Sequence, residues 1–238
     1  MNSLVIAALV GAHIIIAIST FAMMNPVLMG MKSGHDLSPI VVYEQHSTLD
    51  AQLKTVHDAL GTDFEGYRNH CLRTLTFVHH QMPDLVFEKQ PNILDIVSVA
   101  LAFHSVGMWT HGPQDYIKHS TALMEQNLRK EGIWDDNSIH MMREIILLHD
   151  LFGEYKDGES EWMNEMIDTV RHAYWADTTV GFIRGDMHTS IVEAAYKKVP
   201  DAGFHNVITS MTSHFSFYGI LLRLVGLSPS LTPRNIKV

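Results

Sequence analysis

The chain has 238 residues, of which 46% are hydrophobic and 18% are charged, so it can build one sizeable core and an appendage. Its 17 Lys and Arg against 26 Asp and Glu give a formal charge of −9, which argues against a protein that binds the nucleic-acid backbone. A small phosphate substrate is not excluded, because a few local cations or a metal can hold one. The single cysteine, Cys71, excludes a disulfide within the chain.

Residues 4–24 form an uncharged apolar stretch, and the first charged side chain after it is Lys32. At about 1.5 Å per residue, a helix over this stretch is about 30 Å long, the thickness of a bilayer core. We therefore expect an apolar helix over residues 1–30 that anchors the protein in a membrane, with a cytoplasmic body because the flanking charge follows the helix. The alternatives are a cleaved signal peptide, which would make the protein secreted or periplasmic, and a buried helix of the fold.

The rest of the chain predicts successive helices and contains no convincing strand alternation. We expect helices over residues 49–60, 67–81, 93–106, 121–131, about 138–151, about 160–177, about 190–200 and about 206–225. Asn137 or Ser138, Ser160 and a capping box opened by Ser190 are the expected helix starts. The prediction is an all-α protein with a connector over residues 31–48, one helical domain over 49–228 and a short tail over 229–238.

Four polar residues lie within apolar helical stretches: His70, His104, His149 and Asp177. Burying such groups is costly unless each is hydrogen-bonded or bound to a metal. Helical bundles build metal sites from single inward side chains on several helices, so these four are candidate metal ligands. The alternative is that each is an ordinary core or surface residue with its hydrogen bonds satisfied.

Six segments between residues 66 and 208 show motif-like text in a fixed order. They read GYRNHCLR from residue 66, AFHSVGMWT from 102, DYIKHS from 115, ILLHD from 146, RHAYWADTTVG from 171 and PDAGFH from 200. In this order they resemble the first histidine helix, A-x-F-H-D-x-G-x-W-T, D-Y-L-x-P-S, I-x-x-H-H, R-R-A-D-x-x-D-x-x-x-G and P-N-A-G-F-H. These motifs belong to the HD-domain superfamily of metal-dependent phosphohydrolases.

The resemblance implies an HD-domain-like helical bundle that holds one or two divalent metals, with His70, His104, His149 and Asp177 as the surviving ligand candidates. In the family, the metal activates a water that attacks a phosphate ester, often in a nucleotide, while some members use two irons for oxygenase chemistry. Imidazole and carboxylate ligands suit Mn, Fe, Ni, Co or Zn. A bound cation lowers the pKa of its water and neutralises charge on phosphoryl oxygens.

The sequence departs from the family pattern at three positions. Ser105 replaces the aspartate of the His-Asp dyad, Tyr174 replaces the aspartate of A-D, and Asp150 replaces the second histidine of H-H. Losing two anionic ligands removes much of the attraction for a dication. We therefore expect at most one weakly held metal, or none.

Arg73, Lys118 and Arg171 could hold a substrate phosphate, although each could instead form a structural salt bridge. The sequence predicts a hydrolase of a small phosphate ester or nucleotide with a weakened metal site. The alternative is a catalytically inactive HD-like protein that binds a ligand or partner, or has a structural role at a membrane. The sequence assigns neither the catalytic residues nor the oligomeric state.

Overall fold

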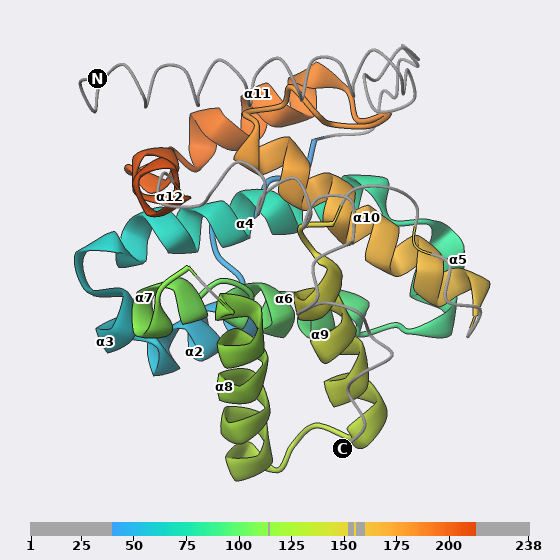
Figure 1. Cartoon of the computed structure of the whole chain (residues 1–238). Helices are drawn as coiled ribbons and strands as arrows, with labels where there is room; N and C mark the ends of the chain where they lie inside the picture. Colours follow the sequence, from blue (N-terminus) through green and yellow to red (C-terminus); the bar gives the residue numbers. More distant parts are fainter. Residues whose placement is uncertain (1–39, 114, 152–154, 156–159, 213–238) are drawn as a thin grey trace.

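The computed structural model describes residues 40–113, 115–151, 155 and 160–212, and all regular secondary structure in this part of the chain is helical (Figure 1). The all-α class is therefore confirmed. The predicted helix over residues 1–30, the tail, and the end of the last predicted helix lie outside the described residues.

The described part of the chain forms a series of helices. They are α2 (Ser47–Thr55), α3 (His57–Leu60), the 3-10 turn η2 (Gly61–Asp63), α4 (Phe64–Gln81), α5 (Asp84–Lys89), α6 (Ile93–Phe103), α7 (Gly107–His111), α8 (Tyr116–Glu131), α9 (Asp136–Leu148), α10 (Glu161–Thr178), α11 (Thr189–Lys198) and α12 (Phe204–Thr212). Helix α4 packs against α10 and α6, and α6 also packs against α2 and α9. Helices α8 and α9 lie side by side in the lower half of Figure 1, and α11 covers α4 at the top.

Helix α6 is the centre of the core because its sequence is apolar almost all round. Nine of its eleven residues are buried, including Ile96, Val99 and Phe103. The run Ile93–His111 is also the one stretch among the described residues that is long and apolar enough to cross a membrane, but 78% of its apolar window is buried within the fold. Its hydrophobicity is accounted for by its central place in the core.

The chain turns sharply after α6, where a helix continuing to residue 106 was predicted. The prediction is wrong at this end, because α6 stops at Phe103 and a new short helix, α7, begins at Gly107. A Cβ at Gly107 would lie 2.1 Å from the carbonyl oxygen of Tyr116. The glycine therefore lets α7 pack directly on the start of α8, and the turn places His104 beyond the end of α6.

Two of the three predicted N-cap positions differ from those in the structure. The N-cap of α9 is Asp135, whose carboxylate accepts a hydrogen bond from the backbone N–H of Ser138 at 2.8 Å. The N-cap of α11 is His188, whose ring nitrogen accepts from the backbone N–H of Ser190, so Ser190 lies inside the helix and does not open it. Ser160 occupies the N-cap position of α10 as predicted. Local capping patterns identified these helices and missed their first residues by a turn or less.

Candidate functional site

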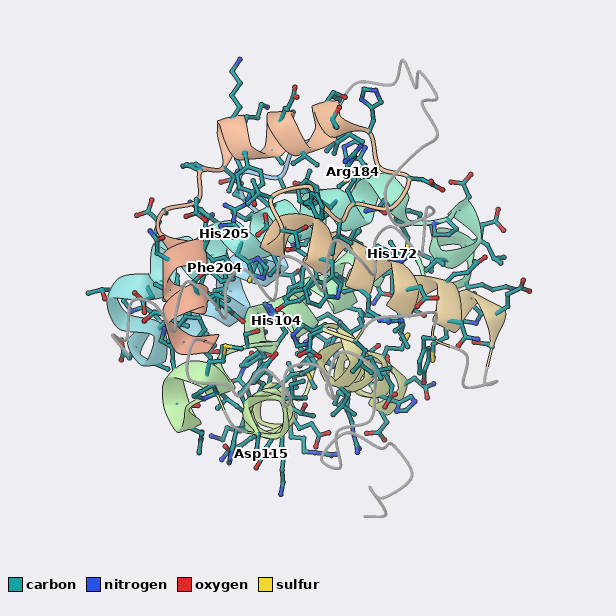
Figure 2. The ribbon with its side chains drawn as sticks, turned by 45° about the horizontal axis from the view of Figure 1, so that its top comes forward. His104, Asp115, His172, Arg184, Phe204 and His205 are labelled. Carbon is teal, nitrogen blue, oxygen red and sulfur yellow. The ribbon has the colours of Figure 1, made fainter. Side chains whose placement is uncertain are left out.

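The four candidate ligands are buried in the middle of the fold. His70 lies on α4, His104 and His149 directly follow α6 and α9, and Asp177 lies near the end of α10; none is more than 1% exposed. In Figure 2, His104 is near the centre of the molecule, with Phe204 and His205 close above it. Segments far apart in the sequence thus bring three imidazoles and one carboxylate into one buried region.

His104 and His149 are held in the same way by the ends of their helices. Each is the C-cap residue of its helix, and its Nδ1 lies 2.6 or 2.7 Å from the carbonyl oxygen three residues earlier, that of Leu101 or Ile146. Carbonyls in the last turn of a helix lack intrahelical partners. Because a carbonyl oxygen only accepts, Nδ1 carries the hydrogen in both rings, and Nε2 is left without one when the ring is neutral.

His70 is held by a side chain from another helix. Its Nδ1 lies 2.6 Å from Oδ2 of Asp177, and its Nε2 lies 3.1 Å from Nε2 of His104. Burial lowers the pKa of His70, although Asp177 partly offsets this, and burial together with the neighbouring histidines lowers the pKa of His104 well below its usual value. Both rings are therefore neutral near pH 7.

The two facing Nε2 atoms cannot both be satisfied by neutral rings. Asp177 is ionised and only accepts, so it takes the Nδ1 hydrogen of His70, just as Leu101 takes that of His104. The hydroxyl of Tyr67 lies 3.0 Å from Nδ1 of His104, but it donates to the same carbonyl of Leu101, so it does not relieve the facing pair. Two lone pairs thus face each other at 3.1 Å, an arrangement that is favourable only with a cation between them.

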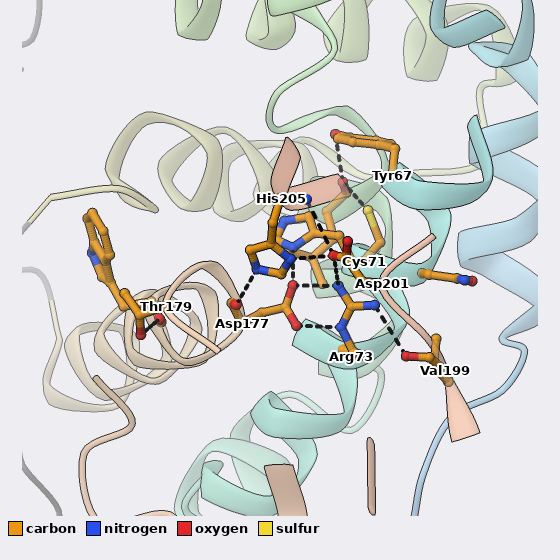
Figure 3. A network of polar contacts seen from close by, with 12 residues as sticks. Tyr67, Cys71, Arg73, Asp177, Thr179, Val199, Asp201 and His205 are labelled. Atoms are coloured by element: carbon orange, nitrogen blue, oxygen red, sulfur yellow. Dashed lines mark hydrogen bonds and ion pairs between the residues drawn. The ribbon is translucent and has the colours of Figure 1, made fainter. Parts of the chain in front are cut away.

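Asp177 is ionised because it is bound by a buried arginine, as Figure 3 shows. Arg73 donates from Nε to Oδ1 at 2.5 Å and from a terminal nitrogen to Oδ2 at 3.0 Å. Burial opposes ionisation of Asp177, but the hydrogen bond from His70 and the charge of Arg73 lower its pKa to about 2. The carboxylate lies on the Nδ1 edge of His70, away from the Nε2 atom that faces His104.

Tyr174 stands among the three imidazoles at the position where the resemblance expects an aspartate. Its ring is nearly perpendicular to those of His70, His104 and His149, at centroid distances of 5.8, 5.8 and 4.7 Å. Ser105, at the dyad position, is buried, and its backbone N–H donates to the hydroxyl oxygen of Tyr67. The two positions at which the resemblance expects carboxylates are thus occupied by neutral side chains.

The described residues do not form a complete metal-ligand set. No group of three or more His, Cys, Asp or Glu side chains within the described ranges has the geometry of a metal site. The pair of His70 and His104 does fit two positions of one ion, since Nε2 atoms bound at about 2.1 Å lie about 3.0 to 3.4 Å apart at octahedral or tetrahedral angles. The donor pair therefore suits one ion held by two imidazoles, with its other ligands from outside the protein side chains.

Asp150 is near His149 but differs from it in its surroundings. It is 7% exposed, and its Oδ2 accepts from the hydroxyl of Tyr116 at 3.0 Å. The same hydroxyl oxygen lies 3.4 Å from Nε2 of His149. Tyr116 thus links the two residues at the positions of the H-H motif, the retained His149 and the substituted Asp150.

The three candidate phosphate-binding residues have different surroundings. Arg73 is buried and is committed to Asp177 and to the carbonyls of residues 199 and 200. Arg171 is 4% exposed and donates to the carbonyl of Leu151 and to Asp168. Lys118 is exposed on α8. The two arginines have the contacts of structural ion pairs, the alternative considered above.

Two aromatic residues that sequence reasoning did not single out complete the region. Tyr67 stacks on His104 at 5.4 Å between centroids, and Phe204 lies flat on His70 at 4.0 Å with 9° between the rings. Tyr67 precedes His70 by three residues on α4, which places both on one face of the helix. Phe204 belongs to the PDAGFH segment, and its place in that motif was the available signal.

Comparisons of the chain with protein-family models, curated proteins and solved structures find no match. The resemblance to HD-domain phosphohydrolases therefore stays a prediction from the motif text.

Proposed function

We propose that this protein is an HD-type, metal-dependent hydrolase of a small phosphate ester or nucleotide, with a weakened site for a single transition-metal ion. The observation that supports it best is the pair of Nε2 atoms of His70 and His104, which face each other at 3.1 Å while both Nδ1 atoms are engaged elsewhere. A divalent cation relieves the repulsion between two lone pairs, and imidazole ligands favour Mn, Fe, Ni, Co or Zn over Mg.

The proposal assigns metal-binding, shielding and phosphate-binding roles to different residues of the chain. His70 and His104 would hold the ion, with His149 as the third candidate ligand. When bound, such an ion lowers the pKa of a coordinated water and neutralises charge on a phosphoryl oxygen. Tyr67 and Phe204 pack on two of the histidines and keep bulk water from the ring faces. Lys118 is the exposed cation among the three phosphate-binding candidates.

Elemental analysis of the full-length protein tests the proposal. We expect up to one transition-metal ion per chain after expression in medium supplemented with Mn, Fe, Ni, Co and Zn, and slow hydrolysis of bis(p-nitrophenyl) phosphate that a chelator abolishes. Two tightly bound ions per chain would contradict the single weak site. Hydrolysis that persists in chelator would contradict the metal dependence.

A catalytically inactive HD-like protein is the second candidate, and two observations favour it. Both oxygens of Asp177 are committed to Arg73 and His70, and Tyr174 stands where a ligating carboxylate is expected. Such a protein would bind a ligand or partner, or have a structural role at a membrane. A full-length protein that carries no metal under any supplementation, and instead shares an extra proton between His70 and His104, would establish this second candidate.

We further propose that residues 4–24 attach the protein to a membrane, with the helical body in the cytoplasm. The support is the length of the stretch and its lack of charged side chains. The full-length chain is expected in the membrane fraction, released by detergent and retained in alkaline carbonate. A mature chain that begins near Met23 by mass spectrometry would indicate a cleaved signal peptide and a secreted or periplasmic protein instead.

A further inference from the structure

The three buried histidines obtain their Nδ1 hydrogen bonds from two different sources. His104 and His149 follow the last residue of a helix, so each reaches a backbone carbonyl of its own helix. His70 lies inside α4, where the carbonyls are occupied by the i to i−4 bonds of the helix. Its Nδ1 acceptor therefore has to come from elsewhere in the fold, and Asp177 of α10, 107 residues away in the sequence, supplies it.

We propose that Asp177 is a positioning residue that fixes His70 in the form with hydrogen on Nδ1 and so turns the Nε2 lone pair toward His104. This assignment differs from the metal-ligand role that the family resemblance implies for Asp177. It deepens the proposed function, on which its consequence for metal binding rests. A histidine ligand whose other nitrogen donates to a carboxylate is held in one orientation and is a more basic ligand.

Arg73 fixes the carboxylate in this role. Its guanidinium binds both oxygens of Asp177 and also donates to the backbone carbonyls of Val199 and Pro200, so neither partner can turn without breaking several bonds. Arginine stays charged in proteins, and this keeps Asp177 an acceptor. The guanidinium carbon of Arg73 lies 4.5 Å from the centroid of the Tyr196 ring, so this ring covers one face of the guanidinium.

The imidazole of His70 is restrained on its face as well as on its edge. Phe204 lies parallel to it at 4.0 Å, and the next residue, His205, is tied through Nε2 to the backbone carbonyl of Asp177 at 2.9 Å. The segment that covers the ring is thus attached to the same residue that holds its edge. Rotation of the His70 ring would disturb both its stacking on Phe204 and its hydrogen bond to Asp177.

The substitution Asp177→Asn tests the proposal with the full-length chain. The side-chain amide keeps the shape, but it can turn its NH2 group toward Nδ1, which then has to accept, and the hydrogen of His70 moves to Nε2. An amide in place of the carboxylate beside a catalytic histidine is known to fix the wrong ring form in this way. Asp168→Asn is the matched control, because Asp168 lies on the same helix and pairs with the buried Arg171.

Two measurements are made on the wild type and on each variant: the position of the hydrogen on the His70 ring and the affinity for Co²⁺. In chelator-treated protein with ¹⁵N-labelled histidine, the ring nitrogens of His70, assigned by their loss in His70→Gln, should show hydrogen on Nδ1 in the wild type and in Asp168→Asn. They should show it on Nε2 in Asp177→Asn. Titration with Co²⁺ should show about 10- to 100-fold weaker binding for Asp177→Asn and no change for Asp168→Asn.

The outcomes separate the two proposals. Hydrogen on Nε2 of His70 in the wild type overturns the positioning role, and this result stands even if Asp177→Asn does not fold. A folded Asp177→Asn that keeps hydrogen on Nδ1 overturns it too. A wild type that binds no Co²⁺ but shows hydrogen on Nδ1 supports the positioning role and counts against the proposed function.

Discussion

Two of the close histidine pairs among the described residues, one buried and one near the surface, are arranged in opposite ways. His70 and His104 meet edge to edge, with Nε2 atoms 3.1 Å apart and rings inclined by 38°. His111 of α7 and His119 of α8 meet face to face, with centroids 3.6 Å apart and rings within 5° of parallel. The first pair directs its lone pairs at one another, and the second directs them past one another.

The difference shows that proximity of histidines is a poor guide to metal binding. The lone pair of an imidazole lies in the plane of its ring, so stacked rings cannot direct two lone pairs at one ion. The Nδ1 hydrogen bonds of the buried pair settle which nitrogen is available, whereas His111 is exposed to solvent and its Nδ1 contacts the hydroxyl of the neighbouring Thr110. The ring edges and their partners therefore decide which pair is a candidate site.

The largest expected effect is the loss of metal binding when either member of the buried pair is replaced. His70→Gln and His104→Gln should each weaken Co²⁺ binding by about 100-fold or more, since removing a ligand costs more than disturbing its outer partner. His119→Gln should leave binding unchanged, because its ring stacks on His111. Calorimetric titration of the three variants makes the comparison. Equal losses in all three would mean that the edge-to-edge contact has no special role.

A smaller gain is expected from restoring the carboxylates of the family pattern. Ser105→Asp with Tyr174→Asp should strengthen Co²⁺ binding about tenfold or more, by placing two anions beside the buried pair. Without metal, the double variant should melt at a lower temperature than the wild type, because buried carboxylates without a counter-ion are costly. Unchanged affinity in a folded double variant would show that these two positions do not limit the site.

The buried pair should also make stability depend on pH in metal-free protein. The pKa values of His70 and His104 are lowered from 6.5 in the folded state, so the unfolded chain binds more protons between the folded and unfolded pKa values. Stability is then complete above about pH 6.5 and falls as the pH is lowered. Melting temperatures between pH 7.5 and 5 in chelator should fall less steeply for His104→Gln than for the wild type or His119→Gln. Parallel profiles for all three would contradict this.

The smallest expected effect concerns the aromatic cover of the buried pair. Phe204→Leu removes the ring stacked on His70 and should lower the free energy of unfolding by about 1 kcal/mol beyond the area lost. Phe182→Leu is the control, because Phe182 is 46% exposed, and its effect should stay within about 0.5 kcal/mol. Urea unfolding measures both. If Phe182→Leu lowers the free energy of unfolding as much as Phe204→Leu does, the stacking of Phe204 on His70 is not the cause of the loss.

Residue pattern alone predicted the helices and the burial of the histidines, because both depend on local apolar spacing. It placed His104 at an apolar helix end, and the structure has it there, fully buried. It did not predict the break before Gly107, since the apolar run continues through it and the close approach of Gly107 to the carbonyl of Tyr116 is a tertiary contact. The assignment of Asp177 also needed the structure, because its partners His70 and Arg73 lie more than 100 residues away and leave no local signal.

The bonds of Arg73 have a consequence for the order in which the protein can fold. They join it to residues 104 and 127 positions later, Asp177 and Pro200. Contacts of such sequence separation carry a large loop-closure entropy and form late. During synthesis α4 leaves the ribosome well before either partner, so its cation has no buried counter-ion until residue 177 has emerged. The ion pair of Arg73 and the Nδ1 bond of His70 are therefore expected to form only after α10 has been synthesised and has packed on α4.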